Sequence, residues 1–228
     1  MKWLSHAGFQ ITSEKGKVVL VDPWLEGNPL APCTVNDLAA ADLVLVSHDH
    51  FDHSGNAAQI VKKTGAVLVA MPETAGRLKE EAGIPEEQVA FGIGMNIGGT
   101  YQNGGISVVM TQAHHSSPTG SPAGYILRME NGFTIYHAGD TGIFASMQIL
   151  GELYPLDLAL LPIGGVFTMD PRQAAAAVKL LRPRMVIPMH YKTFPILVQD
   201  AAPFVAAVRE AAPETEVVVL APGEEKEF

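Results

Sequence analysis

The sequence contains a single cysteine, Cys33, and this scarcity limits both its covalent structure and its metal chemistry. One cysteine cannot form a disulfide within the chain, and no cluster of thiolate ligands can be assembled from it. Any metal ion would therefore have to bind histidine and carboxylate side chains. The chain has 8 His and 24 Asp plus Glu residues to supply them.

Basic residues are also few, with 15 Lys plus Arg and a formal net charge of -9. Nonspecific binding to a nucleic-acid backbone requires clustered Lys and Arg, so nucleic acid is a disfavoured partner. A small-molecule substrate is expected instead. An anionic one stays open, because bound divalent ions would make one pocket locally positive.

Long apolar segments are missing as well. No stretch reaches the roughly 18 to 20 apolar residues of a membrane span, so we expect no membrane association. The N-terminus, Met1 to His6, lacks the apolar core and small-residue cleavage site of a secretory signal. These absences predict a cytoplasmic location. The pattern is silent on oligomeric state and leaves a homo-oligomer open.

The remaining composition is that of an ordinary globular protein. Hydrophobic residues make up 47% and charged residues 17%, which is enough apolar material for a sizeable core. The length lies within the range of one α/β domain, and no linker or low-complexity segment interrupts the chain. We expect one domain covering residues 1–228.

Strand and helix patterns alternate in the first part of the chain. Short β-branched runs at 17–22, 42–47 and 66–71 predict buried strands. Apolar residues at helical spacing follow the second and third runs, at 55–64 and 73–82. Each of these predicted helices ends at a glycine suited to a C-terminal cap.

The middle of the chain predicts strands at 107–111, 124–130 and 133–137, with Asn131-Gly132 as a hairpin turn. The last part alternates again: strands are expected at 156–162, 185–189 and 216–220, and helices at 171–181 and 201–211. Two strand-rich halves with flanking helices predict a mixed α/β (α+β) fold. The expected architecture is a four-layer αββα sandwich, with two sheets packed face to face and helices outside.

Four candidate metal ligands crowd the loop after the strand 42–47, in the run His48-Asp49-His50-Phe51-Asp52-His53. Side chains two apart in an extended segment point the same way, so His48 and His50 can bind one ion. Asp52 and His53 can turn toward a second ion as the chain bends into the next helix. The alternative, a polar loop that only caps this helix, is disfavoured by the specific spacing in its strand-loop-helix context.

This HxHxDH pattern after a hydrophobic strand resembles the first metal motif of the metallo-β-lactamase superfamily. The resemblance implies later single ligands in a fixed order, which His115, Asp140 and His190 match. Spacing alone cannot choose between His114 and His115. The resemblance favours His115, because it directly precedes a Ser-Ser pair as the ligand does in close relatives.

The resemblance extends from Met1 to about Gly223 and implies the metallo-β-lactamase fold. The stretches Asp22-Pro23-Trp24 and Pro162-Ile163-Gly164-Gly165 look like a branch of small metal-dependent hydrolases related to ascorbate-phosphate lactonases. Two divalent metal ions are implied, zinc first, with manganese, nickel, iron or cobalt as alternatives for the same donors. The implied ligands are His48, His50 and His115 on one ion, Asp52, His53 and His190 on the other, and Asp140 between them.

Two residues are predicted to act in catalysis. Asp52 would orient the attacking water, and His6 would face the metals or the substrate. The alternative for His6, which the pattern places in an opening strand, is a hydrogen-bonded core histidine. Asp22 either orients a metal-bound histidine or begins the turn before Pro23. His137 is expected to be structural.

These expectations converge on a metal-dependent hydrolase in which a water bridging two divalent ions attacks an ester, lactone or phosphodiester bond. A ribonuclease-like phosphodiesterase is one alternative, disfavoured by the acidic charge and by the lack of room for an RNA-clamping domain between Asp140 and His190. A non-hydrolytic di-iron redox protein is another, although the resemblance implies a carboxylate at position 50 in such relatives. A non-catalytic metal-binding protein is the last. Fold alone does not make a β-lactamase, and specificity is expected in loops such as 92–99 and 167–169.

Overall fold

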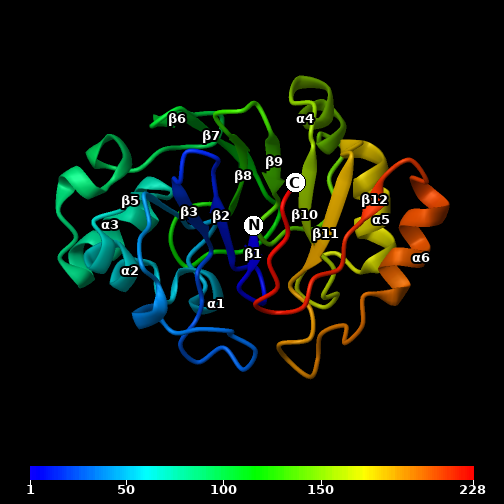
Figure 1. Cartoon of the computed structure of the whole chain (residues 1–228), viewed down its shortest axis with the longest axis horizontal. Helices are drawn as coiled ribbons and strands as arrows, with labels where there is room; N and C mark the ends of the chain where they lie inside the picture. The colour runs from blue at the N-terminus through cyan, green and yellow to red at the C-terminus, as the bar shows by residue number, and fades with distance from the viewer.

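Two β-sheets form the centre of the molecule and helices lie on their outer faces (Figure 1). The computed structural model describes residues 1–228. The first sheet, in spatial order, contains β1 (Lys2–Trp3), β2 (Phe9–Thr12), β3 (Val18–Val21), β4 (Leu43–Leu45) and β5 (Val67–Val69). The second sheet runs from β12 to β6 and contains β6 (Thr100–Asn103), β7 (Ile106–Gln112), β8 (Ala123–Arg128), β9 (Thr134–His137), β10 (Leu158–Pro162), β11 (Met185–Met189) and β12 (Glu216–Val217).

Helices α2 (Ala57–Thr64) and α3 (Pro72–Ala82) cover the first sheet, and α4 (Met147–Leu153), α5 (Pro171–Leu181) and α6 (Ala202–Ala211) lie beside the second (Figure 1). The short helix α1 (Phe51–Ser54) directly follows the histidine-rich loop. The predicted four-layer sandwich is therefore confirmed. None of these helices is long and apolar enough to cross a bilayer.

The alternation of side chains along the strands divides the core into two parts. Leu43 and Leu45 of β4 point into the large core between the sheets, whereas Val44 belongs to a smaller core under α2 and α3. Successive side chains of a strand face opposite sides, so a continuous apolar run fits a strand buried on both faces. The hydroxyl of Tyr125 in β8 donates to the carbonyl oxygens of Val46 and Val69 across the two sheets.

The helix ends follow the signals in the sequence. Gly65 and Gly83 adopt left-handed C-cap conformations, with φ of 76° and 65°. The Asp170 side chain accepts a hydrogen bond of 2.7 Å from the backbone N–H of Gln173, and Pro171 occupies the first turn of α5. The predicted antiparallel middle is confirmed, since β7, β8 and β9 pair in that way.

The sequence pattern missed β2, β6 and α4, because four-residue strands and a seven-residue helix carry few periods of their pattern. The prediction that His6 lies in an opening strand was wrong. His6 occupies the turn between β1 and β2, with a positive φ of 53°. A turn lets its carbonyl and ring point at the second sheet, which a continuous strand would not allow.

Candidate metal centre

All seven predicted ligands converge at one edge of the sandwich, where strands of both sheets end. His48, His115 and Asp140 each follow the last residue of a strand by three positions, after β4, β7 and β9. His190 comes directly after β11. Because β3 to β5 are parallel to one another and β9 to β12 likewise, their carboxyl ends collect at a single edge of each sheet.

Asp140 lies at the centre of this cluster. Its Oδ2 atom is 3.0 Å from Nε2 of His190, 3.3 Å from Nε2 of His53, 3.6 Å from Nε2 of His115 and 3.9 Å from Nε2 of His48. One carboxylate oxygen is thus faced by four imidazole nitrogens from both sheets. The family resemblance of the sequence implies a bridging carboxylate at Asp140.

Two groups of donor atoms adjoin Asp140, and a third group, formed by His48, His53 and Asp140 itself, links them. The first consists of His48, His50 and His115, whose candidate ligand atoms lie within 4.8 Å of one another. Nε2 of His48 is only 2.9 Å from Nδ1 of His50. The side chain of His115 is 11% exposed, so this group is open to solvent on one side.

The second group consists of Asp52, His53, His190 and also His6, again with candidate ligand atoms within 4.8 Å of one another. Nε2 of His6 is 3.1 Å from Oδ2 of Asp52, and its Nδ1 is 2.5 Å from the hydroxyl of Thr193. The His6 ring packs on the His190 ring with centroids 3.8 Å apart. His6 is therefore part of the cluster and not a remote core histidine.

Asp22 fixes the orientation of His53 from behind. Its Oδ2 lies 2.8 Å from Nδ1 of His53, which leaves Nε2 of that ring directed at Asp140. The same carboxylate accepts hydrogen bonds from the backbone N–H and the hydroxyl of Ser47. The Ser47 hydroxyl is also 3.0 Å from Nδ1 of His48. Carboxylates commonly hold the second ring nitrogen of a metal-binding histidine in this way.

Several buried nitrogens and oxygens of the cluster have no hydrogen-bond partner, among them Nε2 of His53, both ring nitrogens of His190 and Oδ1 of Asp140. Nε2 of His190 lies 3.0 Å from Oδ2 of Asp140 without the geometry of a hydrogen bond. Buried polar atoms are rarely left unpaired without a reason such as a bound ion or water. Imidazole and carboxylate donors suit divalent transition metals, so the residues fit a metal site.

The electrostatics of the cluster hold His48 and Asp140 in protonation states that can bind a metal, whereas Asp140 and Asp22 outweigh burial and raise the pKa of His53 well above its ordinary value. Burial, reinforced by the nearby His53, lowers the pKa of His48 to about 2, so this ring is neutral and free to donate a lone pair. Burial alone would raise the pKa of Asp140, but His190 and His53 outweigh it and hold that pKa well below its ordinary value. Burial, with His190 beside it, lowers the pKa of His6 to about 4.

Tight backbone geometry supports two of the ligands. Gly139, next to Asp140, has a φ of 60°, and a Cβ there would lie 2.4 Å from the carbonyl oxygen of Ala123. A Cβ on Gly164 would lie 2.3 Å from the carbonyl oxygen of His190. His6, Asp22 and His190 themselves have positive φ, a conformation that is costly for residues with a Cβ and clusters at functional sites.

The structure also separates the neighbouring polar residues that do not join the cluster. His114 stacks on Phe144, with ring centroids 5.0 Å apart, while His115 faces Asp140. Nε2 of His137 lies 2.8 Å from the carbonyl oxygen of Ala7, in keeping with a structural role. Asp49, between the candidate ligands His48 and His50, pairs with Arg77.

Sequence reasoning missed Ser47 and Thr193, whose hydroxyls contact the rings of His48 and His6. Ser47 ends a predicted strand and Thr193 follows His190 by three residues, but serine and threonine are common at such places. Only their hydrogen-bond partners distinguish them. Thr193 and His6 are 187 residues apart in the sequence, whereas Ser47 directly precedes His48.

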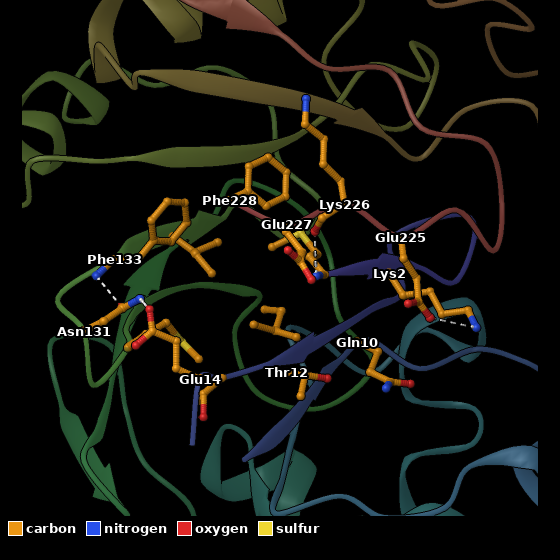
Figure 2. A pocket seen from close by; sticks show the side chains of 15 residues that line it. Lys2, Gln10, Thr12, Glu14, Asn131, Phe133, Glu225, Lys226, Glu227 and Phe228 are labelled. Carbon is orange, nitrogen blue, oxygen red and sulfur yellow. Dashed lines mark hydrogen bonds and ion pairs between the residues drawn. The ribbon is translucent and has the colours of Figure 1, made fainter. Parts of the chain in front are cut away.

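A groove of about 730 Å³ lies away from the cluster and contains none of its residues. Figure 2 shows Lys2, Gln10 and Thr12 on one side of it and Phe133 and Phe228 on another. Its two basic side chains have partners: Lys2 pairs with Glu225 at 3.4 Å, and Nζ of Lys226 lies 5.6 Å from the Phe228 ring centroid. The shape of this groove does not by itself indicate a catalytic site.

Comparison with known proteins agrees with the geometry of the cluster. The family model of the beta-lactamase superfamily domain matches residues 17–191, which include every candidate ligand except His6. The chain belongs to the metallo-β-lactamase superfamily.

Relatives within the superfamily match nearly the whole chain. A UPF0173 metal-dependent hydrolase of Nitratidesulfovibrio vulgaris (strain DP4) is 54% identical over 222 residues, which are 97% of this chain and 92% of the relative. The structure of Igni18, a metallo hydrolase from the archaeon Ignicoccus hospitalis KIN4/I, aligns with a TM-score of 0.87 and 41% identity over 98% of this chain and 95% of the other.

A more distant structure shows a similar fold in another chemical setting. CmlA, a diiron β-hydroxylase from Streptomyces venezuelae, aligns with a TM-score of 0.73 at 17% identity over 96% of this chain and 52% of its own. At this identity the likeness concerns the fold alone. Function has to be argued from the site, because one fold carries many chemistries.

Proposed function

We propose that this metal-dependent hydrolase binds two divalent ions at the cluster around Asp140 and cleaves an ester, lactone or phosphodiester bond of a small molecule. One observation carries the proposal: Oδ2 of Asp140 faces the Nε2 atoms of four histidines, two from each of two groups of donor atoms. A single ion would use only one group. Two groups sharing one carboxylate are the arrangement expected for a pair of ions.

His48, His50 and His115 would hold one ion, Asp52, His53 and His190 the other, and Asp140 both. Two divalent ions at such a site lower the pKa of a bound water toward about 7 and stabilise the charge that develops on the attacked group. Zinc is the first expectation, since all donors are imidazole or carboxylate.

Protein side chains next to these ions would position the attacking water. Asp52 accepts a hydrogen bond from the attacking water and orients it. His6, neutral at pH 7, donates from Nε2 to Asp52 and accepts at Nδ1 from the Thr193 hydroxyl. In ester cleavage, the water oxygen adds to the acyl carbon, the bond from that carbon to the leaving oxygen breaks, and a proton from the water ends on the leaving alcohol.

The site supports a small substrate. Only His50, Asp52 and His115 of the seven ligands are partly exposed, and the other four are buried. The net charge of -9 gives no support to a polyanionic partner such as RNA.

Metal content and turnover test the proposal together. Protein loaded with zinc or manganese is analysed for bound metal and assayed with aryl esters, lactones and phosphodiesters. We expect about two ions per chain and turnover of at least one class. His50→Ala and His53→Ala should each lose metal and lower kcat/KM by at least a hundredfold.

His114→Ala is the matched control, because its ring is the immediate neighbour of a ligand but stacks on Phe144 outside the cluster. It should keep both metal content and turnover. Full activity of the His50 and His53 variants would contradict the proposal. Oxygen consumption by the iron-loaded protein without any hydrolysis would replace it with the redox alternative.

A further inference from the structure

Apolar side chains stand at the solvent-exposed side of the metal cluster. Phe51 lies between the candidate ligands His50 and Asp52, at the start of α1, and is 65% exposed. A phenylalanine so exposed leaves apolar area in contact with water, and contiguous patches of that kind usually serve for binding.

Phe51 belongs to an aromatic cluster with Trp24 and Phe194. The Trp24 and Phe194 rings stack with centroids 5.6 Å apart and an interplanar angle of 18°. Phe51 meets Trp24 edge to face at 5.6 Å and Phe194 at 6.5 Å. Trp24 is buried and forms the base, whereas Phe51 and Phe194 present their rings further out.

This aromatic cluster is continuous with the second group of ligands. Phe194 contacts His6 edge to face at 5.6 Å, and Trp24 contacts the same ring at 5.2 Å. His6 in turn is 3.1 Å from Asp52. The apolar surface therefore begins where the candidate site of the second ion ends.

The loop that carries Phe194 is held in place. The N–H of Lys192 donates to the Val198 carbonyl at 2.8 Å, and the N–H of Val198 donates to the Gly164 carbonyl at 3.0 Å. Ile196 at the tip of this loop is 59% exposed, and Phe167 on the adjoining loop after β10 is 53% exposed. The hydrogen bond from Val198 to Gly164 thus joins two loops that each carry an exposed apolar side chain.

We propose that Phe51, Phe194 and Ile196 form a subsite for an apolar alkyl or aryl group of the substrate, next to the bond that is cleaved. The inference rests on the proposed hydrolase function and narrows its substrate class. Phe51 is flanked by two ligands and Phe194 contacts His6, so a macromolecule or second subunit covering these rings would also close the metal cluster. A small apolar substituent covers the rings and leaves its scissile bond at the metals.

The effect of acyl chain length on kcat/KM, in a series of ester substrates, tests for this subsite. p-Nitrophenyl acetate, butyrate and hexanoate differ only in apolar length and share one leaving group. Each buried methylene contributes enough to raise kcat/KM by about threefold to fourfold. Hexanoate has four more methylenes than acetate, so their full burial would raise kcat/KM by roughly 80-fold to 250-fold, and we expect a rise of at least about tenfold for the metal-loaded protein. Phe51→Ala and Ile196→Ala should flatten this rise while metal content stays the same.

Leu153→Ala is the matched control. Leu153 is 66% exposed on α4, which leads into the opposite end of β10 from the metal cluster. This variant should keep the full dependence on chain length. Equal kcat/KM for all three esters, with turnover intact, would overturn the apolar subsite and leave the hydrolase function standing.

A binding measurement separates the subsite from turnover. Acetate and hexanoate carry the same charge, and their binding to the metal-loaded protein can be followed by the fluorescence of Trp24, with Trp24→Phe to isolate its signal from Trp3. Hexanoate should bind at least tenfold more tightly, less so in Phe51→Ala. Equal binding would overturn the subsite even if no ester is cleaved. A change of oligomeric state in Phe51→Ala with an unchanged chain-length dependence would make this face a subunit contact and also overturn it.

Discussion

Asp22 and His53 form a fully buried pair, with Oδ2 of the carboxylate 2.8 Å from Nδ1 of the ring. The contact joins the end of β3 to the helix α1 that follows the histidine-rich loop. Two further hydrogen bonds from Ser47 hold the carboxylate in place. Because of this pair, the remaining ring nitrogen of His53 can point only toward Asp140.

Asp22→Asn should weaken metal binding more than it weakens the fold. The amide keeps the shape of the carboxylate but loses the charge that holds the His53 ring, and loss of such a partner commonly costs tenfold to a hundredfold in metal affinity. Competition with a chromophoric chelator measures this affinity. Glu152→Gln, a carboxylate-to-amide change on the exposed surface of α4, is the control and should bind metal normally. Unchanged affinity in Asp22→Asn would show that Asp22 serves the turn alone.

Gly139→Ala should destabilise the protein and impair metal binding. The added Cβ would lie 2.4 Å from the Ala123 carbonyl oxygen and 2.9 Å from Cβ of Ser47, at a backbone φ of 60°. Gly132→Ala provides the comparison, since Gly132 has a φ of 89° but no heavy atom within 4 Å of the new Cβ.

Gly132→Ala should lose only the free energy of unfolding that a left-handed conformation costs, about 1 to 2 kcal/mol. Overpacking should add about 1 to 3 kcal/mol in Gly139→Ala. Urea unfolding at equal metal concentration measures both free energies. Similar losses in the two variants would mean that the segment around Asp140 moves freely to make room.

We propose that His6 positions Asp52, and its two ring nitrogens can be tested separately. Thr193→Val removes the hydroxyl at Nδ1 while keeping the shape of the side chain, and His6→Gln keeps one donor for Asp52. We expect His6→Ala to lower kcat by about tenfold to a hundredfold, with Gln restoring part of it.

The visible spectrum of the cobalt-loaded protein provides a readout beyond activity. A shift of the absorption bands in His6→Ala, partly reversed in His6→Gln, reports a change around Asp52. An unchanged spectrum together with a lowered melting temperature would assign His6 to packing alone. Leu153→Ala should move neither quantity.

Arg77→Ala should destabilise the protein by about 3 to 5 kcal/mol, because it would leave the carboxylate of Asp49 buried without its ionic partner. The Asp49 side chain is 2% exposed, and it also accepts hydrogen bonds from Thr119 and Ser54. Arg77 contacts both oxygens of Asp49.

Lysine lacks the planar pair of donors, so Arg77→Lys should recover only part of the loss. Glu81→Gln removes the other, exposed partner of Arg77 and should cost less than about 1 kcal/mol. Thermal unfolding of the three variants ranks their losses of stability. If Arg77→Ala were as stable as the parent protein, the ion pair between Asp49 and Arg77 would not stabilise the fold.

How well the sequence predicted each part of the site depends on how far apart in the chain the interacting residues lie. The run 48–53 could be recognised because its donors are neighbours in the chain and lie between a strand and a helix. The choice of His115 over His114 came from a resemblance, and the structure now gives a physical distinction between them in the stacking of His114 on Phe144. The turn of His6 escaped prediction because its conformation depends on contacts with the second sheet, such as the bond from the N–H of His190 to its carbonyl.

By itself, the sequence determined the apolar runs that become buried strands, the glycines that end α2 and α3, and the local group of histidine and aspartate donors. Periodicity and turn chemistry act over a few residues, so these features are present before the chain folds. Only the tertiary structure decided that Asp140 faces four histidines from two sheets and that Phe194 stacks on Trp24 at the edge of the cluster. Such contacts join residues up to 187 positions apart, and they form only where the packing of the two sheets brings strand ends to a common edge.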